Sequence, residues 1–195
     1  MSDFTILTVC TGNICRSPLA EMLLRQALQG LPVVVHSAGT HALDGYGMPE
    51  PQLAIAASLG VSNCDVHQAK TLTGDHVEGA DLILAMGREH RSAVVQLSAR
   101  ALRRAFTIRE LARIAPSVTD TELVEQNDAD IASRLRHAVE AAATNRGLAL
   151  PAKRPEDDDV VDPYRRDTDV YETSRDQLLH SLNSVLDYFR RAIEL

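Results

Sequence analysis

Phe4-Thr5-Ile6-Leu7-Thr8-Val9 leads directly into Cys10-Thr11-Gly12-Asn13-Ile14-Cys15-Arg16-Ser17. The first six residues are apolar and β-prone, which predicts a buried strand. Helix-forming residues follow Ser17, so the unit is a strand, a short loop and a helix. The loop therefore lies at a helix N-terminus, where unpaired backbone N–H groups attract anions.

The thiol of Cys10 and the guanidinium of Arg16 suit a site that attacks a bound phosphate. A thiolate is a nucleophile, and a helix N-terminus and a nearby cation favour that form of cysteine. The planar guanidinium matches two phosphate oxygens. The competing interpretation is a buried structural cysteine beside a chance arginine. The full string from Cys10 to Ser17, placed between a predicted strand and a predicted helix, favours a functional site over this chance arrangement.

The backbone of the loop is suited to curl around an anion. Gly12 permits backbone angles that a side chain forbids, and Asn13 tolerates a left-handed conformation. Ser17 can cap the helix or donate its hydroxyl to the thiolate. Inward-facing N–H groups then form an anion-binding nest. The residues expected to bind phosphate are Thr11, Gly12, Asn13, Ile14, Cys15 and Arg16.

Beyond this loop, the chain resembles a known family. The segment from Val9 to Glu21 resembles the signature of low-molecular-weight protein tyrosine phosphatases. Three further segments resemble the family's second-strand turn, its network histidine and its acid loop: Ser37-Ala38-Gly39-Thr40, His67-Gln68-Ala69-Lys70 and Asp162-Pro163-Tyr164. The match covers 4–97 and 159–195, whereas 98–158 is longer than the usual family core.

The resemblance implies hydrolysis of phosphotyrosine through a cysteinyl-phosphate intermediate, without a cofactor. It assigns Cys10 as nucleophile, Arg16 as phosphate ligand and Asp162 as general acid, which then acts as base toward water. The residues Ser17, Ser37 and His67 would support the strained Asn13. Without the resemblance, Asp162-Pro163 would indicate only a turn. The acidic run 156–159 is expected to be a solvated loop.

The walls of the substrate slot are less clearly specified. Family members place an aromatic residue near the position of Leu43 and often a second one where Arg165 stands. We expect Leu43, Tyr46 and Tyr164 to line the slot, with Tyr46 supplying the missing ring. Stacking of an aromatic substrate on a tyrosine contributes about 0.5–1.5 kcal/mol beyond its buried area.

Cys15 has two interpretations. It can be a small apolar residue behind the loop, or it can form a disulfide with Cys10 that protects the nucleophile from over-oxidation. Cys64 is expected to be structural. No cluster of Cys and His shows metal-ligand spacing.

Length and composition predict one domain over 1–195. The formal net charge of −7 disfavours nucleic acid as a partner. No apolar run has transmembrane length, and the first residues lack the basic region of a signal peptide. Three cysteines, an odd number, indicate reduced thiols in the cytoplasm rather than a disulfide framework.

Alternating patterns predict an α/β fold of three layers, with a four-stranded parallel sheet covered by helices on both faces. The ligand should bind at the carboxyl ends of the strands, where Cys10 lies. A loop is expected over 147–161. Strands are predicted at 4–9, 33–35, 81–86 and 105–107, and helices at 17–29, 51–59, 88–102, 108–114, 123–145 and 167–193.

Three alternative functions stay open. The resemblance associates a phosphoarginine phosphatase with threonine at the position of Ile14, and isoleucine has no hydroxyl to offer a guanidino substrate. A thiol-linked arsenate reductase needs two relay cysteines beyond the loop, and only Cys64 remains there. A non-catalytic phosphate-binding module, with 98–158 as a platform for a partner, is opposed by the presence of Cys10, Arg16 and Asp162.

Overall fold

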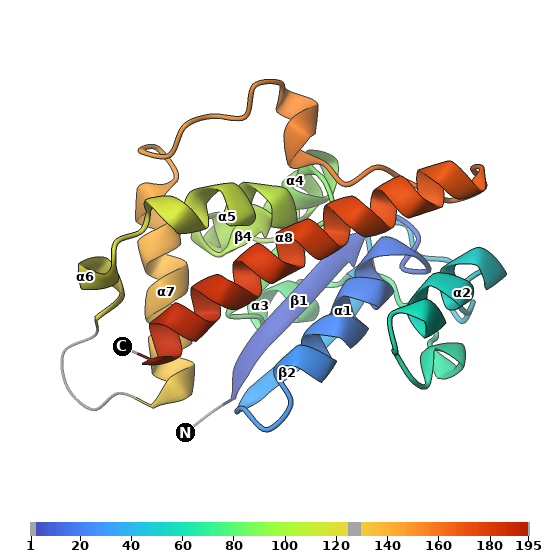
Figure 1. Ribbon diagram of the computed structural model, residues 1–195, viewed down its shortest axis with the longest axis horizontal. Helices are drawn as coiled ribbons and strands as arrows, with labels where there is room; N and C mark the ends of the chain where they lie inside the picture. Colours follow the sequence, from blue (N-terminus) through green and yellow to red (C-terminus); the bar gives the residue numbers. More distant parts are fainter. Residues whose placement is uncertain (1–2, 125–129, 195) are drawn as a thin grey trace.

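A computed structural model describes residues 3–124 and 130–194. Four parallel strands form one sheet in the order β2-β1-β3-β4 (Figure 1). The strands are β1 (Phe4–Cys10), β2 (Val33–Gly39), β3 (Leu82–Ala85) and β4 (Ala105–Thr107). The predicted α/β class with a four-stranded parallel sheet is confirmed.

The central position of β1 follows from its sequence. Nearly every residue of β1 is buried, as expected for a strand with neighbours on both sides and helices on both faces. Its last residue pairs in register with Gly39 of β2, and Val9 pairs with Ala85 of β3. Cys10 therefore ends β1 at the sheet edge where the other parallel strands also end.

Helices cover both faces of the sheet. One face packs against α1 (Arg16–Ala27), α5 (Ile108–Ile114), α7 (Ile131–Asn145) and α8 (Thr168–Glu194), and its core includes Phe4, Leu19, Phe106 and Leu178. The other face packs against α3 (Gly74–Glu78) and α4 (Arg88–Leu97), around Leu7, Ile83 and Val94. The helix α2 (Glu50–Ser58) contacts α8. Short 3-10 turns lie at Cys64–Val66, Ala99–Arg103, Ala115–Ser117 and Pro155–Asp158.

The predicted helix over 123–145 is wrong at its start. A four-residue helix, α6 (Asp120–Leu123), ends there, and α7 begins at Ile131, while 125–129 lie outside the described residues. Thr119 caps α6 and Asp130 caps α7 by accepting from backbone N–H groups. Both caps are short polar side chains of the kind that favours the start of a helix.

Other boundaries also differ from the prediction. The helix predicted over 88–102 ends at Leu97 and continues as the 3-10 turn Ala99–Arg103, and the expected loop over 147–161 contains a second such turn. The short helix α3 was not predicted. Thr73 starts it with a capping box to His76, in place of the usual Glu or Gln.

The helix α7, which lies within residues 98–158, packs onto the same core as the strands. Leu135 and Ala138 of α7 join the cluster that contains Phe4 and Phe189, and the Tyr188 hydroxyl donates to the Ala138 carbonyl oxygen at 2.7 Å. None of the helices within residues 3–124 and 130–194 is long and apolar enough to cross a lipid bilayer.

Candidate active site

Residues 10–17, hereafter the anion loop, curl between the end of β1 and the start of α1. Three successive loop carbonyls face outward and accept backbone N–H groups of the segment after β2: Cys10 from Thr40, Thr11 from His41 and Gly12 from Leu43, at 2.9, 3.0 and 3.1 Å. Every peptide bond here is trans, so each N–H points opposite to its carbonyl. The N–H groups of Thr11, Gly12 and Asn13 therefore face the inside of the curl.

Asn13 lies at the centre of a buried network. Its φ is +54°, in the left-handed region, and its side-chain amide donates to the hydroxyls of Ser17 and Ser37 at 2.9 and 2.8 Å. The His67 Nε2 lies 2.7 Å from the Asn13 backbone oxygen, which can only accept, so His67 donates. The Lys70 N–H donates to Asn13 Oδ1 at 2.8 Å. The four residues that the sequence suggested for this network are thus brought together.

The strand β2 approaches the loop closely at Gly39. A Cβ atom built on Gly39 would lie 2.5 Å from the Thr11 carbonyl oxygen and 3.0 Å from the Asn13 Cβ. Both contacts are shorter than van der Waals separation, and one is with backbone. Only glycine leaves room for the loop at this position.

The Cys10 sulfur is buried at the base of the loop. It lies 2.9 Å from the Ser17 Oγ and accepts the Asn13 N–H at 3.3 Å. Because the Ser17 Oγ already accepts from Asn13, its own hydrogen is available to the sulfur. Two donors therefore converge on Cys10, which is the arrangement that stabilises a thiolate.

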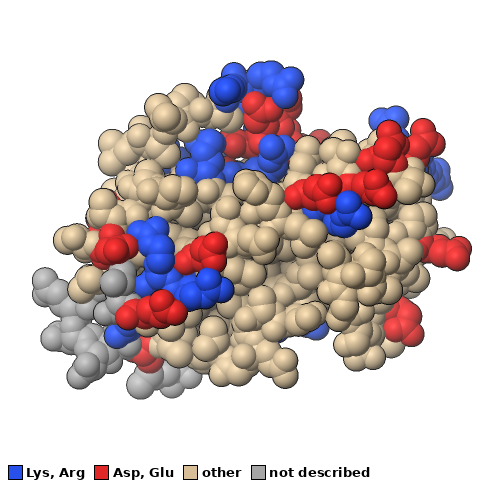
Figure 2. All heavy atoms as spheres, in the orientation of Figure 1, with Lys and Arg blue, Asp and Glu red and all other residues tan. Residues whose placement is uncertain are grey.

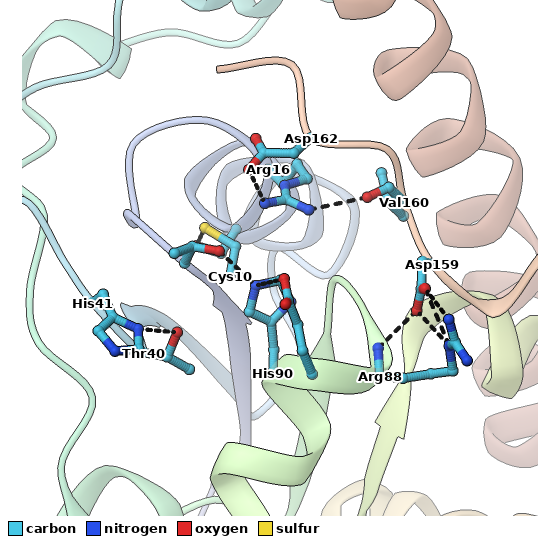
Figure 3. A network of polar contacts seen from close by, with 12 residues as sticks. Cys10, Arg16, Thr40, His41, Arg88, His90, Asp159, Val160 and Asp162 are labelled. Carbon is cyan, nitrogen blue, oxygen red and sulfur yellow. Dashed lines mark hydrogen bonds and ion pairs between the residues drawn. The ribbon is translucent and has the colours of Figure 1, made fainter. Parts of the chain in front are cut away.

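Arg16 connects the loop to the segment that carries Asp162 (Figure 3). One terminal nitrogen pairs with the Asp162 carboxylate at 2.8 Å, and the other donates to the Val160 carbonyl oxygen at 3.0 Å. The Arg16 Nε is buried and has no partner among the described residues. The Asp162 side chain is 51% exposed, so it lies at the mouth of the site.

A cavity of about 190 Å³ opens above the loop. Its walls include the three predicted catalytic side chains together with Leu43 and Tyr164, and the ring of Tyr164 lies beneath the Arg165 guanidinium. Tyr46 is 67% exposed and does not line this cavity, so the expectation that it supplies a wall is wrong. The chain turns at Gly45, which carries Tyr46 outward. His41 lines the cavity instead.

The segment 157–164, hereafter the acid segment, is fastened by arginines. Asp158 pairs with Arg113, and Asp159 pairs with Arg88, each at 2.8 Å. Arg109 donates to the Asp159 backbone oxygen at 2.8 Å. The expected solvated loop is therefore wrong for Asp158 and Asp159. These arginines lie 45 to 71 residues earlier in the chain, beyond the range of any local pattern.

His90 is a site residue that sequence analysis missed. It is 1% exposed, and its Nε2 lies 2.8 Å from the Thr11 Oγ1 in the anion loop. Burial, and then the nearby Arg16 charge, lower the pKa of His90 to about 4, so the ring is neutral at physiological pH. A weak signal existed, because His90 opens the helix after β3, at the same sheet edge as Cys10.

Cys15 faces the core behind the loop. Burial, with a further contribution from the charge of Cys10, raises the pKa of the Cys15 thiol to about 12, while a hydrogen bond from Tyr171 of α8 opposes the shift. Cys10, Cys15 and Cys64 are all free thiols. Over the parts of the chain that the structure describes, no three His, Cys, Asp or Glu side chains gather in a way that could hold a metal ion.

Comparisons with known proteins point to one family. The model of the family described as low molecular weight phosphotyrosine protein phosphatase matches residues 5–124. A probable low molecular weight protein-tyrosine-phosphatase, EpsP of Ralstonia solanacearum, is 52% identical over 83 residues, which are 43% of this chain and 55% of that protein. A protein-arginine-phosphatase of Bacillus subtilis is 37% identical over 108 residues, or 54% and 70% of the two chains.

A solved structure agrees in fold. The tyrosine phosphatase AmsI of Erwinia amylovora superposes with a TM-score of 0.66 over 96% of this chain and 93% of that chain, at 24% identity. The chain spans about half the length of the curated tyrosine phosphatase EpsP that it matches. The family model nevertheless covers more than half of this chain, from β1 past α6. The chain belongs to the low molecular weight phosphotyrosine protein phosphatase family.

Proposed function

We propose that this chain is a protein tyrosine phosphatase that hydrolyses phosphotyrosine through a cysteinyl-phosphate intermediate. One observation carries the proposal: Cys10, Arg16 and Asp162 line a single cavity, and the Arg16 guanidinium pairs with the Asp162 carboxylate. A nucleophile, an anion ligand and an acid thus face the same space. The oxyanion in this site would be bound by Arg16 and by the loop N–H groups, with the Thr11, Gly12, Asn13, Ile14 and Cys15 amides as donors.

The proposed reaction has two steps. The Cys10 thiolate attacks phosphorus, the ester P–O bond breaks, and Asp162 gives its proton to the leaving tyrosine oxygen. In the second step Asp162, now a carboxylate, takes a proton from water as that water attacks phosphorus. The P–S bond breaks, inorganic phosphate leaves, and the thiolate is restored. Ser17 donates to the sulfur both as attacking and as leaving group.

A phosphoarginine phosphatase is the second candidate, because the Bacillus subtilis relative carries that activity in its name and matches over a longer stretch. Ile14 decides between the two. Its side chain lines the cavity and offers an apolar surface to an aryl ester, with no hydroxyl for a guanidino group. The same cavity would hold phosphotyrosine or phosphoarginine, so the preference between these substrates depends on the wall that Ile14 forms.

The test compares phosphotyrosine peptide, phenyl phosphate and phosphoarginine as substrates of the wild type and of Ile14→Thr. We expect aryl phosphates to be preferred by the wild type and the preference to move toward phosphoarginine in the variant. Preference of the wild type for phosphoarginine would overturn the tyrosine assignment. Bound phosphate without turnover of any substrate would indicate a non-catalytic module, and reduction of arsenate with a thioredoxin system would indicate a reductase.

We also propose that oxidation stores Cys10 as a disulfide with Cys15. Peroxide would oxidise Cys10 to a sulfenic acid, and the Cys15 thiol would then condense with it, releasing water. Because the pKa of Cys15 is about 12, this thiol is almost wholly protonated, which leaves Cys10 as the sulfur that peroxide meets first. Cys15→Ser should therefore recover less activity with dithiol after peroxide. Equal recovery would assign Cys15 to packing alone.

The reduced state of all three cysteines supports a reducing, cytoplasmic setting for this proposed enzyme. We further propose that residues 1–195 form one phosphatase domain, since described parts of 98–158 share the core of the family segments. Limited proteolysis tests this: one protected fragment is expected, and early loss of 98–158 with retained activity would contradict it.

A further inference from the structure

The anion loop carries a hydroxyl that the reaction above does not use. Thr11 lines the active-site cavity, and its Oγ1 lies 2.8 Å from the Nε2 of His90 on α4. Figure 3 places His90 beside Cys10, on the side where α4 begins. No further partner of the Thr11 hydroxyl is found in residues 3–124 and 130–194. The direction of this one hydrogen bond therefore decides where the Thr11 hydrogen can point.

The surroundings of His90 fix its tautomer. The neutral ring has one N–H, on either Nδ1 or Nε2. The Nδ1 is buried and lacks a partner among the described residues, while a Glu89 carboxylate oxygen lies 3.4 Å from Nε2. Either tautomer leaves the buried Nδ1 without a partner among the described residues, so the Glu89 carboxylate decides, because a hydrogen on Nδ1 would turn the Nε2 lone pair toward it. The hydrogen therefore belongs on Nε2, and His90 donates to Thr11.

The consequence falls on Thr11. An oxygen that accepts from His90 keeps its own hydrogen free to donate elsewhere. We infer that the Thr11 hydroxyl, held by His90, donates a hydrogen bond to the oxyanion bound in the anion loop. His90 is then a positioning residue, which acts on the oxyanion only through Thr11. The inference rests on the proposed function to the extent that the loop binds phosphate.

The charges around His90 suit this role. Arg16 and His41 disfavour a second cation there, whereas Asp162 and Asp159 favour one, and burial outweighs the carboxylates. A neutral ring donates through Nε2 without adding a positive charge beside Arg16. The donor set of the loop then includes a side chain that is specific to threonine or serine, in addition to backbone groups that any sequence supplies.

The experiment measures binding of inorganic phosphate by titration calorimetry, without substrate turnover. Thr11→Val keeps the shape of the side chain and removes the hydroxyl, whereas Thr11→Ser keeps the hydroxyl and removes the methyl group. Hydrogen bonds to charged groups predict that Thr11→Val weakens phosphate binding by roughly tenfold or more. We expect Thr11→Ser to bind within a few-fold of the wild type. Equal affinity of Thr11→Val and the wild type, or an affinity that follows the methyl group, would overturn the inference.

The role of His90 is tested through coupling. His90→Phe should weaken phosphate binding in the presence of Thr11 and have no further effect on the Thr11→Val background, whereas His90→Gln offers a replacement donor. Additive effects would show that His90 acts independently of Thr11 and would overturn the positioning role. If His90→Phe does not fold, as judged by thermal unfolding, His90→Leu removes the same donor and is compared on both backgrounds by the same rule.

Failure of this inference differs from failure of the proposed function. A wild type that binds phosphate but hydrolyses no aryl phosphate contradicts the proposed function. The phosphate affinities of the wild type, Thr11→Val and Thr11→Ser still test the inference in that case. A wild type that hydrolyses aryl phosphates, with Thr11→Val equal to it in phosphate affinity, contradicts only the inference.

Discussion

The anion loop and the acid segment meet at Arg16, yet different forces hold them. The loop is fixed by hydrogen bonds in which Asn13 donates to Ser17 and Ser37 and accepts from His67. The acid segment is fixed by two ion pairs, Asp159 with Arg88 and Asp158 with Arg113, and both pairs are partly open to solvent. Buried neutral bonds are insensitive to salt, whereas partly exposed ion pairs are screened by it. The proposed nucleophile is thus held by the loop, whereas the position of the proposed acid depends on charge. Figure 2 shows acidic and basic side chains lying against one another at several places on the visible face.

Of the changes in the anion loop and the acid segment, removal of the proposed nucleophile should reduce the rate of hydrolysis most. Cys10→Ser replaces sulfur by oxygen inside the same hydrogen bonds, so the loop should fold normally. A serine hydroxyl is not ionised at neutral pH, and hydrolysis of phenyl phosphate should fall to the background rate. The thermal midpoint should stay within about 3 °C of the wild type. Retained turnover would rule out the covalent intermediate.

Removing the acid should give the next largest effect, and it should depend on the leaving group. Asp162→Asn is expected to slow phenyl phosphate hydrolysis by ~10²–10⁴-fold, the usual range for general acid catalysis. Hydrolysis of p-nitrophenyl phosphate should slow less, because nitrophenolate leaves readily without a proton. Steady-state rates for both esters check this. An equal, small loss would mean that Asp162 is only a turn residue.

A change behind the loop should test its rigidity without touching a reacting group. Gly39→Ala places a methyl group against the Thr11 carbonyl oxygen and forces the loop to move. Overpacking of this kind costs roughly 1–3 kcal/mol of unfolding free energy, and activity should fall with it. Gly74→Ala is the matched control, because no atom lies within 4 Å of the added carbon. Chemical denaturation and rates with phenyl phosphate compare the two.

The smallest effect is expected from removing one of the ion pairs that hold the acid segment in place. Asp159→Asn removes the ion pair with Arg88, a partly exposed contact worth up to about 1 kcal/mol, so kcat/KM should fall by no more than about fivefold. High salt should slow the wild type more than the variant, because the variant keeps only the pair of Asp158 and Arg113 to be screened. The exposed pair of Asp187 and Arg190 on α8 is remote from the site, and Asp187→Asn is the control. Equal salt responses would show that charge does not position the acid.

The same contrast explains what could be predicted from sequence. The strand, loop and helix around Cys10 are contiguous, so local patterns predicted their order. The network of Asn13 with Ser37 and His67 joins residues 24 and 54 positions apart and was implied only by the family resemblance. Asp162 begins an Asp-Pro pair that by itself indicates only a turn, so its role as the acid was implied by the resemblance alone. The contacts of His90 with Thr11 and of Asp159 with Arg88 join residues 79 and 71 positions apart and leave no local signal. Helix ends at Thr119 and Asp130 were missed because capping side chains were outweighed by an alanine-rich pattern.

The shared guanidinium of Arg16 links ligand binding to the position of the acid. In this structure Arg16 forms an ion pair with Asp162 and donates a hydrogen bond to the Val160 carbonyl oxygen of the same segment. A dianion that takes over the guanidinium competes with Asp162, so its apparent affinity is lowered by the free energy of that pair. A bound anion thereby frees the Asp162 carboxyl from its pair with Arg16. Binding of the phosphate and release of the proposed proton donor are, in thermodynamic terms, one coupled equilibrium.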